Sequence, residues 1–310
     1  MTAVAIVIPT LNRAPLLRHA IASALRCEPA PSEVVVVDCG SIDDTLAVVR
    51  SFGDDVDLIE GDLPNAASAR NTGFQSTQSP YVGFLDSDDE ALPAKTGGLA
   101  AALDASPRAV LIHGVMEIIG GEGDPLPRET ARNAEERKRA KEIGTSYSSL
   151  ARFCSMYTSA TLIRRSAFED VGGYDDSLNT YEDWDLYLRL ALLGRLAYED
   201  IRACRYRIWS GNVPFDRTAR GLAEVARKHL GMLTMVPPTT RHEAELGLRI
   251  RLAGSLYTLL ELPEARREAL EAIFLSRGAA ILTPEVRRIL TRSLLPASLL
   301  GRLRNLRSML

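Results

Sequence analysis

The chain has 310 residues, of which 46% are hydrophobic and 25% are charged, and its formal net charge is −3 at pH 7. These values are those of an ordinary globular protein. The acidic excess within residues 1–217 suits a metal-dependent site better than a nucleic-acid binder. The length is enough for one large α/β domain and a smaller appended region.

The cysteine content and the first residues indicate the compartment. Cys27, Cys39, Cys154 and Cys204 show no paired metal-ligand spacing, so we expect reduced thiols in a cytoplasmic protein. The amino terminus lacks the basic segment of a signal peptide. No apolar run in the sequence reaches the length of a membrane span.

Two buried strands joined by a helix are predicted at the amino terminus. Residues 4–8 and 34–37 are continuous apolar runs, as expected of central strands covered on both faces. The helix between them has an apolar stripe formed by Leu16, Leu17, Ala20, Ile21, Ala24 and Leu25. Residues 39–44 form a turn before a second helix, for which Ser41 is the predicted N-cap. This β-α-β-α order predicts a nucleotide-binding doubly wound sheet.

A further buried strand, within residues 81–85, leads directly into three carboxylates. Asp86, Asp88 and Asp89 follow it, and ligands bind at the carboxyl ends of strands in open α/β sheets. Carboxylate oxygens are the ligands that Mg²⁺ and Mn²⁺ prefer. The alternative is a solvated acidic turn, because Asp and Ser are common turn residues.

Five segments, in their order and spacing, resemble family-2 glycosyltransferases. They are VAIVIPTLNRAPLL, EVVVVDCGSIDDT, NAASARNTGF, YVGFLDSDDEALP and YEDWDLYLRLALLG. Each is weak alone, but the five together cover roughly the first two thirds of the chain. The resemblance implies a GT-A fold, a Rossmann-like, mixed and mostly parallel sheet flanked by helices, over residues 1–217. It also implies inverting transfer of a sugar from a nucleotide donor.

The same resemblance implies a donor site that contains a divalent metal. Asp88 matches the last acid of the family's DXD motif and is the expected ligand of Mn²⁺ or Mg²⁺, while Asp86 contacts the donor's ribose or helps to hold the metal. For Asp89, support of the metal site and capping of the next helix both remain open. The residues expected to bind the nucleotide sugar are Pro9, Thr10, Asn12, Arg13, Asp38, Arg70 and Asp86. For Arg13, a solvated position at the helix start is the alternative. Asn71 is expected to tie one loop to another.

Two departures from the family pattern affect the donor site. Cys39 stands where relatives have a second acid that contacts uracil, so TDP and GDP sugars are credible donors beside UDP sugars. Trp209 stands where relatives often have a histidine, and it either stacks on a sugar or packs in the core. Arg207 is a candidate for the diphosphate.

Asp183 is the predicted general base. The resemblance places the base at the second acid of Glu182-Asp183, and inverting transfer needs a carboxylate that takes the acceptor hydroxyl's proton. Acids also favour a helix N-terminus for structural reasons, and Glu182 or Asp185 are the alternatives for the base. Glu182, Gly173 and Trp209 are expected on the acceptor side.

The carboxyl-terminal region, residues 218–310, is predicted to be helical, with helices over 241–262 and 265–274. Residues 1–217 carry 22 basic and 32 acidic side chains, whereas residues 218–310 carry 15 and 8. Residues 286–310 form a basic amphipathic stretch, which either contacts the inner face of the cell membrane or docks on this chain or a second copy in a homodimer.

The leading functional hypothesis is a cytoplasmic, metal-dependent, inverting glycosyltransferase of polysaccharide, lipopolysaccharide or glycolipid assembly. Its partners are a nucleotide-diphosphate sugar and a glycan or lipid-linked acceptor. A sugar-phosphate nucleotidyltransferase is a weaker alternative, because the loop PTLNRAPLL lacks glycine and lysine. A non-catalytic sugar- or nucleotide-binding scaffold is the other alternative.

Overall fold

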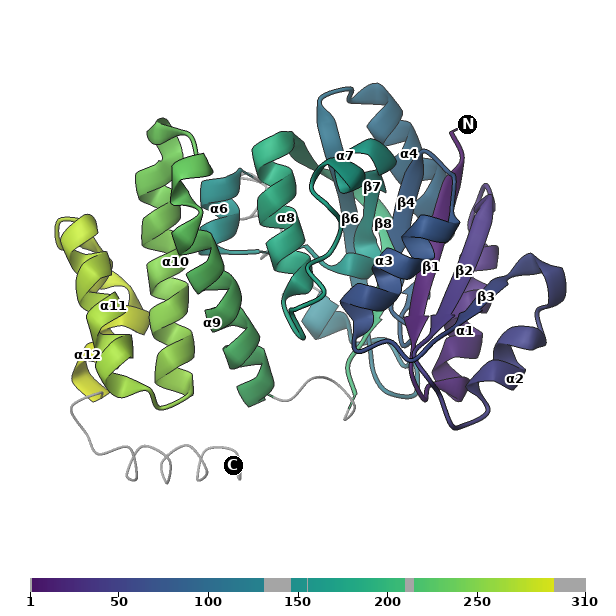
Figure 1. Cartoon of the computed structure of the whole chain (residues 1–310), viewed down its shortest axis with the longest axis horizontal. Coiled ribbons are helices and arrows are strands. Elements are labelled where there is room, and N and C mark those ends of the chain that lie inside the picture. The colour runs from purple at the N-terminus through teal and green to yellow at the C-terminus, as the bar shows by residue number, and fades with distance from the viewer. Residues whose placement is uncertain (1, 131–145, 155, 210–214, 293–310) are drawn as a thin grey trace. The chain divides into compact units, whose positions relative to one another are not determined.

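A computed structural model of the chain describes residues 2–130, 146–154, 156–209 and 215–292 (Figure 1). The chain divides into two compact units. The sheet unit comprises residues 1–146 and 155–212, and the helical unit comprises residues 147–154 and 213–310. The second part of the helical unit begins at residue 213, whereas the boundary was predicted after residue 217. The helical unit also includes the inner segment 147–154, which was not predicted.

The described part of the sheet unit contains an eight-stranded mixed sheet in the order β3-β2-β1-β4-β7-β6-β8-β5. Its strands are β1 (Val4–Thr10), β2 (Glu33–Asp38), β3 (Asp57–Glu60), β4 (Tyr81–Phe84), β5 (Glu90–Ala91), β6 (Ala109–Ile119), β7 (Thr161–Arg164) and β8 (Arg195–Arg207). β1 runs parallel to β2 and β4, β2 runs parallel to β3, and β6 runs parallel to β8. β7 is antiparallel to both of its neighbours, and β5 is antiparallel to β8. The predicted mixed, mostly parallel sheet is confirmed.

Helices flank this sheet, and others form the helical unit (Figure 1). The sheet unit contains α1 (Ala14–Leu25), α2 (Thr45–Arg50), α3 (Ala66–Ser76), α4 (Lys95–Ala105), α7 (Arg165–Asp170) and α8 (Glu182–Leu193). The helical unit contains α6 (Tyr147–Arg152), α9 (Phe215–Gly231), α10 (Pro238–Thr258), α11 (Leu262–Leu275) and α12 (Pro284–Arg292).

The central strands form the core that the apolar runs predicted. All seven residues of β1 and all four residues of β4 are buried. α3 packs closely on this core, because a Cβ on Gly73 would lie 2.4 Å from a methyl group of Val7. The missing side chain therefore lets α3 approach β1, and this approach brings Arg70, one turn earlier in α3, to the end of the sheet.

The predicted N-cap of the second helix is wrong. α2 begins at Thr45, after Asp44 in the N-cap position. The Ser41 hydroxyl instead accepts a hydrogen bond from the Asn12 backbone N–H at 2.8 Å. Ser41 is thus engaged by the loop after β1, and the helix starts four residues later.

The two predicted helices of the carboxyl-terminal region are present. α10 begins three residues earlier than predicted, with proline in its first turn, a position that needs no backbone N–H. α12 is described as far as Arg292, so most of the predicted basic stretch lies outside the described residues, together with its predicted membrane contact. None of the helices in the described ranges combines the length and apolarity that crossing a membrane requires.

Candidate active site

The candidate site lies at the carboxyl ends of β1, β2 and β4, which meet at one edge of the sheet because the three strands are parallel. The loop after β1 and the loop after β2 are joined by two hydrogen bonds. Besides its N–H bond to Ser41, Asn12 accepts the Ile42 N–H with its side-chain oxygen at 2.9 Å, and its backbone has φ of 52°. Asn12 therefore shapes the loops through which a nucleotide would have to be bound.

Asp38, the last residue of β2, keeps one carboxylate oxygen for a ligand. Its Oδ2 accepts the backbone N–H groups of Gly40 and Ser41 at 3.1 and 2.9 Å. Its Oδ1 is buried and has no hydrogen-bond partner within the described parts of the chain. A buried acceptor without a partner is costly, so this oxygen suits a donor group of a bound molecule.

Arg70 links the strand-end acids to the helix that carries the predicted base. Its guanidinium contacts Asp86 Oδ1 at 2.6 Å and Glu182 Oε1 at 2.7 Å. Only 6% of the Arg70 side chain is exposed, whereas a third of the Asp86 side chain is. Asp86 thus reaches the open side of the site, and Arg70 bridges its carboxylate to that of Glu182.

Asp183 lies in the first turn of α8 and has the properties of a base. It is half-buried, and its Oδ1 accepts the Trp184 N–H at 2.7 Å. Burial raises the pKa of Asp183 to about 7, and the negative charge of Glu182 adds to the rise, while Arg70 opposes it. A carboxylate with a pKa near neutrality can exchange a proton with a hydroxyl group in the reaction.

The alternative of Asp185 as the base is wrong. Asp185 is fully buried and forms an ion pair with Arg189 at 2.7 Å. Arg189 also donates to the backbone carbonyls of Val171 and Gly173, each at 2.7 Å. Arg189 therefore fastens α8 to the loop before it, and Asp185 positions Arg189.

That loop positions the predicted acceptor side. Asn71, in α3, donates to the Tyr174 carbonyl and accepts the Tyr174 N–H, both at 2.9 Å, so it ties a helix to a loop rather than one loop to another as predicted. Gly173 has φ of 72°, and a Cβ there would lie 2.6 Å from the Asn71 side-chain oxygen. Glycine at 173 is thus required by both the backbone and the close approach of Asn71.

Asp88, Arg13 and Trp209 form a closed set of contacts next to Asp86. Asp88 Oδ2 accepts the Trp209 indole N–H at 3.0 Å and pairs with the Arg13 guanidinium at 3.2 Å. The guanidinium also lies over the Trp209 ring, 4.4 Å from its centre. Burial raises the pKa of Asp88, and the nearby Asp86 charge adds to this. Arg13 is therefore not merely a solvated residue at the helix start, and Trp209, half-buried, is not packed in the core.

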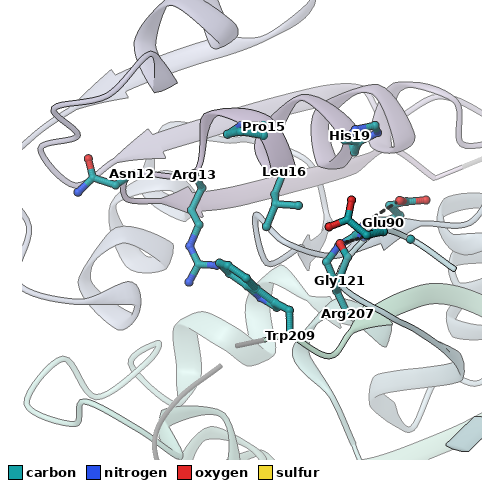
Figure 2. A pocket seen from close by; sticks show the side chains of 11 residues that line it. Asn12, Arg13, Pro15, Leu16, His19, Glu90, Gly121, Arg207 and Trp209 are labelled. Atoms are coloured by element: carbon teal, nitrogen blue, oxygen red, sulfur yellow. Dashed lines mark hydrogen bonds and ion pairs between the residues drawn. The ribbon is translucent and has the colours of Figure 1, made fainter. Parts of the chain in front are cut away.

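A pocket of about 700 Å³ borders this set of contacts (Figure 2). In Figure 2 the Arg13 side chain extends from the start of α1 to the Trp209 ring, and together they form one wall. The pocket is lined by Asn12, Arg13, Pro15, Leu16, His19, Glu90, Gly121, Glu122, Gly123, Arg207 and Trp209. Its mixed charged, apolar and aromatic lining suits a polar organic molecule.

Asp89 and Arg207 hold the acidic loop in place. Asp89 is buried and accepts the Ser159 hydroxyl and the Arg207 backbone N–H, and burial raises its pKa. The capping role considered for Asp89 is wrong, because α4 begins six residues later at Lys95. The Arg207 guanidinium is buried against Glu90 and donates to the Asp88 carbonyl at 2.9 Å, so it braces the loop.

Two supporting residues were not predicted from the sequence. Ser159 accepts the Asp86 N–H at 3.1 Å, besides its bond to Asp89. Lys95 is fully buried and donates to the backbone carbonyls of Phe84 and Ser159. Neither lies in a recognisable motif, since each acts on a loop that is distant along the chain.

The described residues contain no group of three or more His, Cys, Asp or Glu side chains arranged to hold a metal ion. After β4, Asp86 and Asp88 carry carboxylate groups that are partly exposed. Mg²⁺ in phosphate-transfer sites is usually held by one or two carboxylates plus phosphate oxygens and water. The donor set therefore fits a divalent cation that arrives with a diphosphate, and it does not fit an all-protein metal cage.

Comparisons with known proteins agree with this architecture. The family model described as "Glycosyl transferase family 2" matches residues 5–172. The chain is 32% identical over 230 residues to the succinoglycan biosynthesis protein ExoU of Rhizobium meliloti (strain 1021), covering 66% of this chain and 61% of that protein. It is 31% identical over 207 residues to the pre-mycofactocin glycosyltransferase of Mycobacterium tuberculosis (strain ATCC 25618 / H37Rv), covering 64% of this chain and 41% of that protein.

Two solved structures resemble nearly the whole chain. S. aureus TarS 1-349 in complex with UDP-GlcNAc has a TM-score of 0.64 at 16% identity and covers 94% of this chain and 88% of its own. The mannosyltransferase PcManGT from Pyrobaculum calidifontis, in complex with GDP-Man and Mn²⁺, has a TM-score of 0.61 at 20% identity, covering 98% and 87%. At these identities the likeness establishes the fold, and the predicted GT-A fold is confirmed.

Proposed function

The chain belongs to the family-2 glycosyltransferases, and from that premise we propose that it is an inverting, metal-dependent enzyme. It moves a sugar from a nucleoside-diphosphate donor to a hydroxyl group of a glycan or glycolipid. The observation that carries the proposal is the half-buried Asp183, whose pKa is raised to about 7 and which is joined through Glu182 and Arg70 to the strand-end acid Asp86.

Asp183 is the base of the proposed reaction. The acceptor oxygen forms a bond to the anomeric carbon while the bond from that carbon to the diphosphate breaks. The acceptor's proton passes to the Asp183 carboxylate, and the negative charge leaves with the nucleoside diphosphate. Glu182 and Arg70 orient the base and tune its affinity for the proton.

Asp88 and Asp86 are the residues that would hold a divalent cation. When bound, such a cation neutralises the charge that develops on the leaving diphosphate. Arg13, at the start of α1, pairs with Asp88 at 3.2 Å and would supply a further positive charge beside the diphosphate. A related fold with GDP-Man and Mn²⁺ supports this proposal.

The nucleoside binds, in this proposal, over the loops after β1 and β2, through Pro9, Thr10, Asn12 and Asp38. Asp38 Oδ1 is the buried acceptor that still needs a donor, and a base or ribose offers N–H or O–H groups. Cys39 is half-buried beside it and is a poor acceptor, so UDP, TDP and GDP sugars all stay open as donors.

The acceptor is proposed to be a growing polysaccharide or a related glycolipid. The support is the similarity to a succinoglycan biosynthesis protein, of which the matched region spans 61%. Gly173, held by Asn71, shapes the acceptor side next to Asp183.

A thermal-shift panel tests the donor part of the proposal. UDP, GDP, TDP and CMP, with their sugar conjugates, are added with and without Mn²⁺, since a ligand of the folded state raises the melting temperature. We expect one nucleoside diphosphate to give a shift of several degrees that requires Mn²⁺. Asp88→Ala should abolish that shift, and its unliganded melting transition is measured alongside to show that the variant is folded. No shift with any ligand would reject a nucleotide-sugar transferase and favour a non-catalytic member.

A further inference from the structure

Arg13 forms an ion pair with Asp88, the carboxylate that the proposed function assigns to a metal ion. Its guanidinium lies 3.2 Å from Asp88 Oδ2, the oxygen that also accepts the Trp209 N–H at 3.0 Å. Both side chains of the ion pair are largely covered, with 27% of Arg13 and 19% of Asp88 exposed. In this arrangement the positive charge of the Arg13 guanidinium already compensates the negative charge of Asp88.

Trp209 has two separate contacts that maintain the arrangement. Its indole N–H can only donate, so Trp209 cannot be a metal ligand, and it donates to Asp88. Its ring face lies 4.4 Å from the Arg13 guanidinium carbon, a cation–π geometry. Trp209 thus contacts both members of the ion pair.

A nucleoside diphosphate offers Arg13 a better partner than Asp88 does. A diphosphate carries more negative charge than a carboxylate, and one guanidinium group can donate two parallel hydrogen bonds to phosphate oxygens. If Arg13 turned to a bound diphosphate, the charge of Asp88 would be left uncompensated, and Asp88 would then be free to hold a divalent cation. The pocket of about 700 Å³ beside Arg13 leaves space for this movement.

Resting on the proposed donor site, we infer that Trp209 is a positioning residue that holds Arg13 over Asp88, so that a divalent cation binds tightly only together with a nucleoside diphosphate. The two ligands then promote each other's binding, and the coupling is the same whichever is added first. Free Mn²⁺ or Mg²⁺ alone leaves the site in the Arg13-paired state.

The first test measures Mn²⁺ affinity without nucleotide, by the EPR signal of free Mn²⁺, in the full-length wild type and Arg13→Gln. Removing the competing charge should tighten Mn²⁺ binding roughly tenfold, since a unit charge at this distance opposes the cation. The factor by which UDP or GDP improves Mn²⁺ affinity should fall in the same variant. Arg18→Gln removes the same charge from the exposed face of α1 and should match the wild type. Equal Mn²⁺ affinity in Arg13→Gln and wild type would overturn the inference.

The second test separates the ring of Trp209 from its N–H group. Trp209→Phe keeps an aromatic face for Arg13, whereas Trp209→Leu fills space without one. We expect Trp209→Leu to bind Mn²⁺ alone more tightly than Trp209→Phe, by a factor of roughly three or more, the size of a cation–π contact. Both variants are checked for folding by circular dichroism. If the two bind Mn²⁺ equally, Trp209 does not hold Arg13.

The two proposals fail in different ways. If UDP or GDP binds the wild type with Mn²⁺ but Arg13→Gln behaves like the wild type, the proposed function stands and this inference alone is overturned. If no nucleoside diphosphate binds the wild type with Mn²⁺, the donor site itself is wrong, and the inference falls with it.

Discussion

Asp183 combines burial with a neighbouring negative charge, which is why its pKa lies at about 7 rather than at its usual value of 3.8. A base must be ionised to accept a proton, so kcat/KM should rise with pH through about 7 and level off above it. The pH profile of kcat/KM, measured from pH 5.5 to 9 with the donor found by the thermal-shift panel, checks this.

Glu182→Gln serves as the matched variant for that profile. It removes the charge that raises the pKa and frees the positive charge of Arg70, and both changes favour ionised Asp183. The midpoint should therefore move to lower pH by about one unit. A profile that falls with pH, or a midpoint that is the same in both proteins, would contradict Asp183 as the base.

The same pKa shift predicts that Asp183 costs stability. Between pH 3.8 and about 7 the folded protein retains a proton that the unfolded chain has released, so this residue makes stability fall as the pH rises through that window. Asp183→Asn removes the effect and should raise the melting temperature at pH 8, by about 2–4 °C for each kcal/mol recovered.

Calorimetry at pH 5 and pH 8 tests this, because the gain should be larger at pH 8. Asp176→Asn makes the same change at an exposed position in the preceding loop and provides the control. Asp183→Asn should also bind donor normally while losing transfer. A melting temperature that is lower than wild type at pH 8 would argue against a destabilising carboxylate at 183.

At the scale of elements, substitutions at Gly172 and Gly173 distinguish the cost of a strained backbone from the cost of a side-chain clash. Gly172 and Gly173 both have positive φ, of 77° and 72°, but a Cβ on Gly172 meets nothing within 4 Å. Gly172→Ala should cost about 1 kcal/mol for the left-handed conformation alone. Gly173→Ala also displaces the Asn71 side chain, and the loss of its two hydrogen bonds to Tyr174 should add roughly 1–3 kcal/mol.

Urea denaturation of both variants gives the two free energies of unfolding. Gly173→Ala should also weaken catalysis, because the loop it distorts is tied through Arg189 to the helix that carries Asp183. Equal destabilisation by the two substitutions would show that Asn71 yields without cost.

Elements built from continuous apolar runs were predictable from the sequence, and contacts across the sheet were not. β1, β2 and β4 are buried strands followed by polar loops, and their pattern alone indicated a site at one sheet edge. Trp209 meets Asp88 across 121 residues of sequence, and Ser159 meets Asp89 across 70. Such pairings depend on the order of strands in the sheet, which local residue patterns do not contain. For Ser41 the local signal was misleading, because the hydroxyl serves the neighbouring loop.

At the scale of the whole molecule, the chain leaves the sheet unit for α6 and then returns to it. The residues of α6 are mostly buried, and α6 packs on α10. The Tyr147 hydroxyl is 2.9 Å from His229 Nδ1 in α9. The backbone of Arg152 lies close to Gly247 of α10, because a Cβ on Gly247 would be 2.8 Å from the Arg152 backbone nitrogen. α6 thus belongs to the helical unit, although in the sequence it lies between two segments of the sheet unit.

A protein truncated after residue 212 should therefore lose more than its carboxyl-terminal helices. The segment 147–154 would remain without α9 and α10, so Tyr147 and Leu150 would become exposed. We expect the truncated protein to bind the dye ANS and its residues 147–154 to exchange amide hydrogens rapidly. Full-length Tyr147→Phe, which removes the hydrogen bond to His229 but keeps α9 and α10, should retain protection in this segment. A truncated protein that neither binds ANS nor loses protection at 147–154 would show that the sheet unit stabilises α6 by itself, and the organisation into two units would then need to be redrawn around that helix.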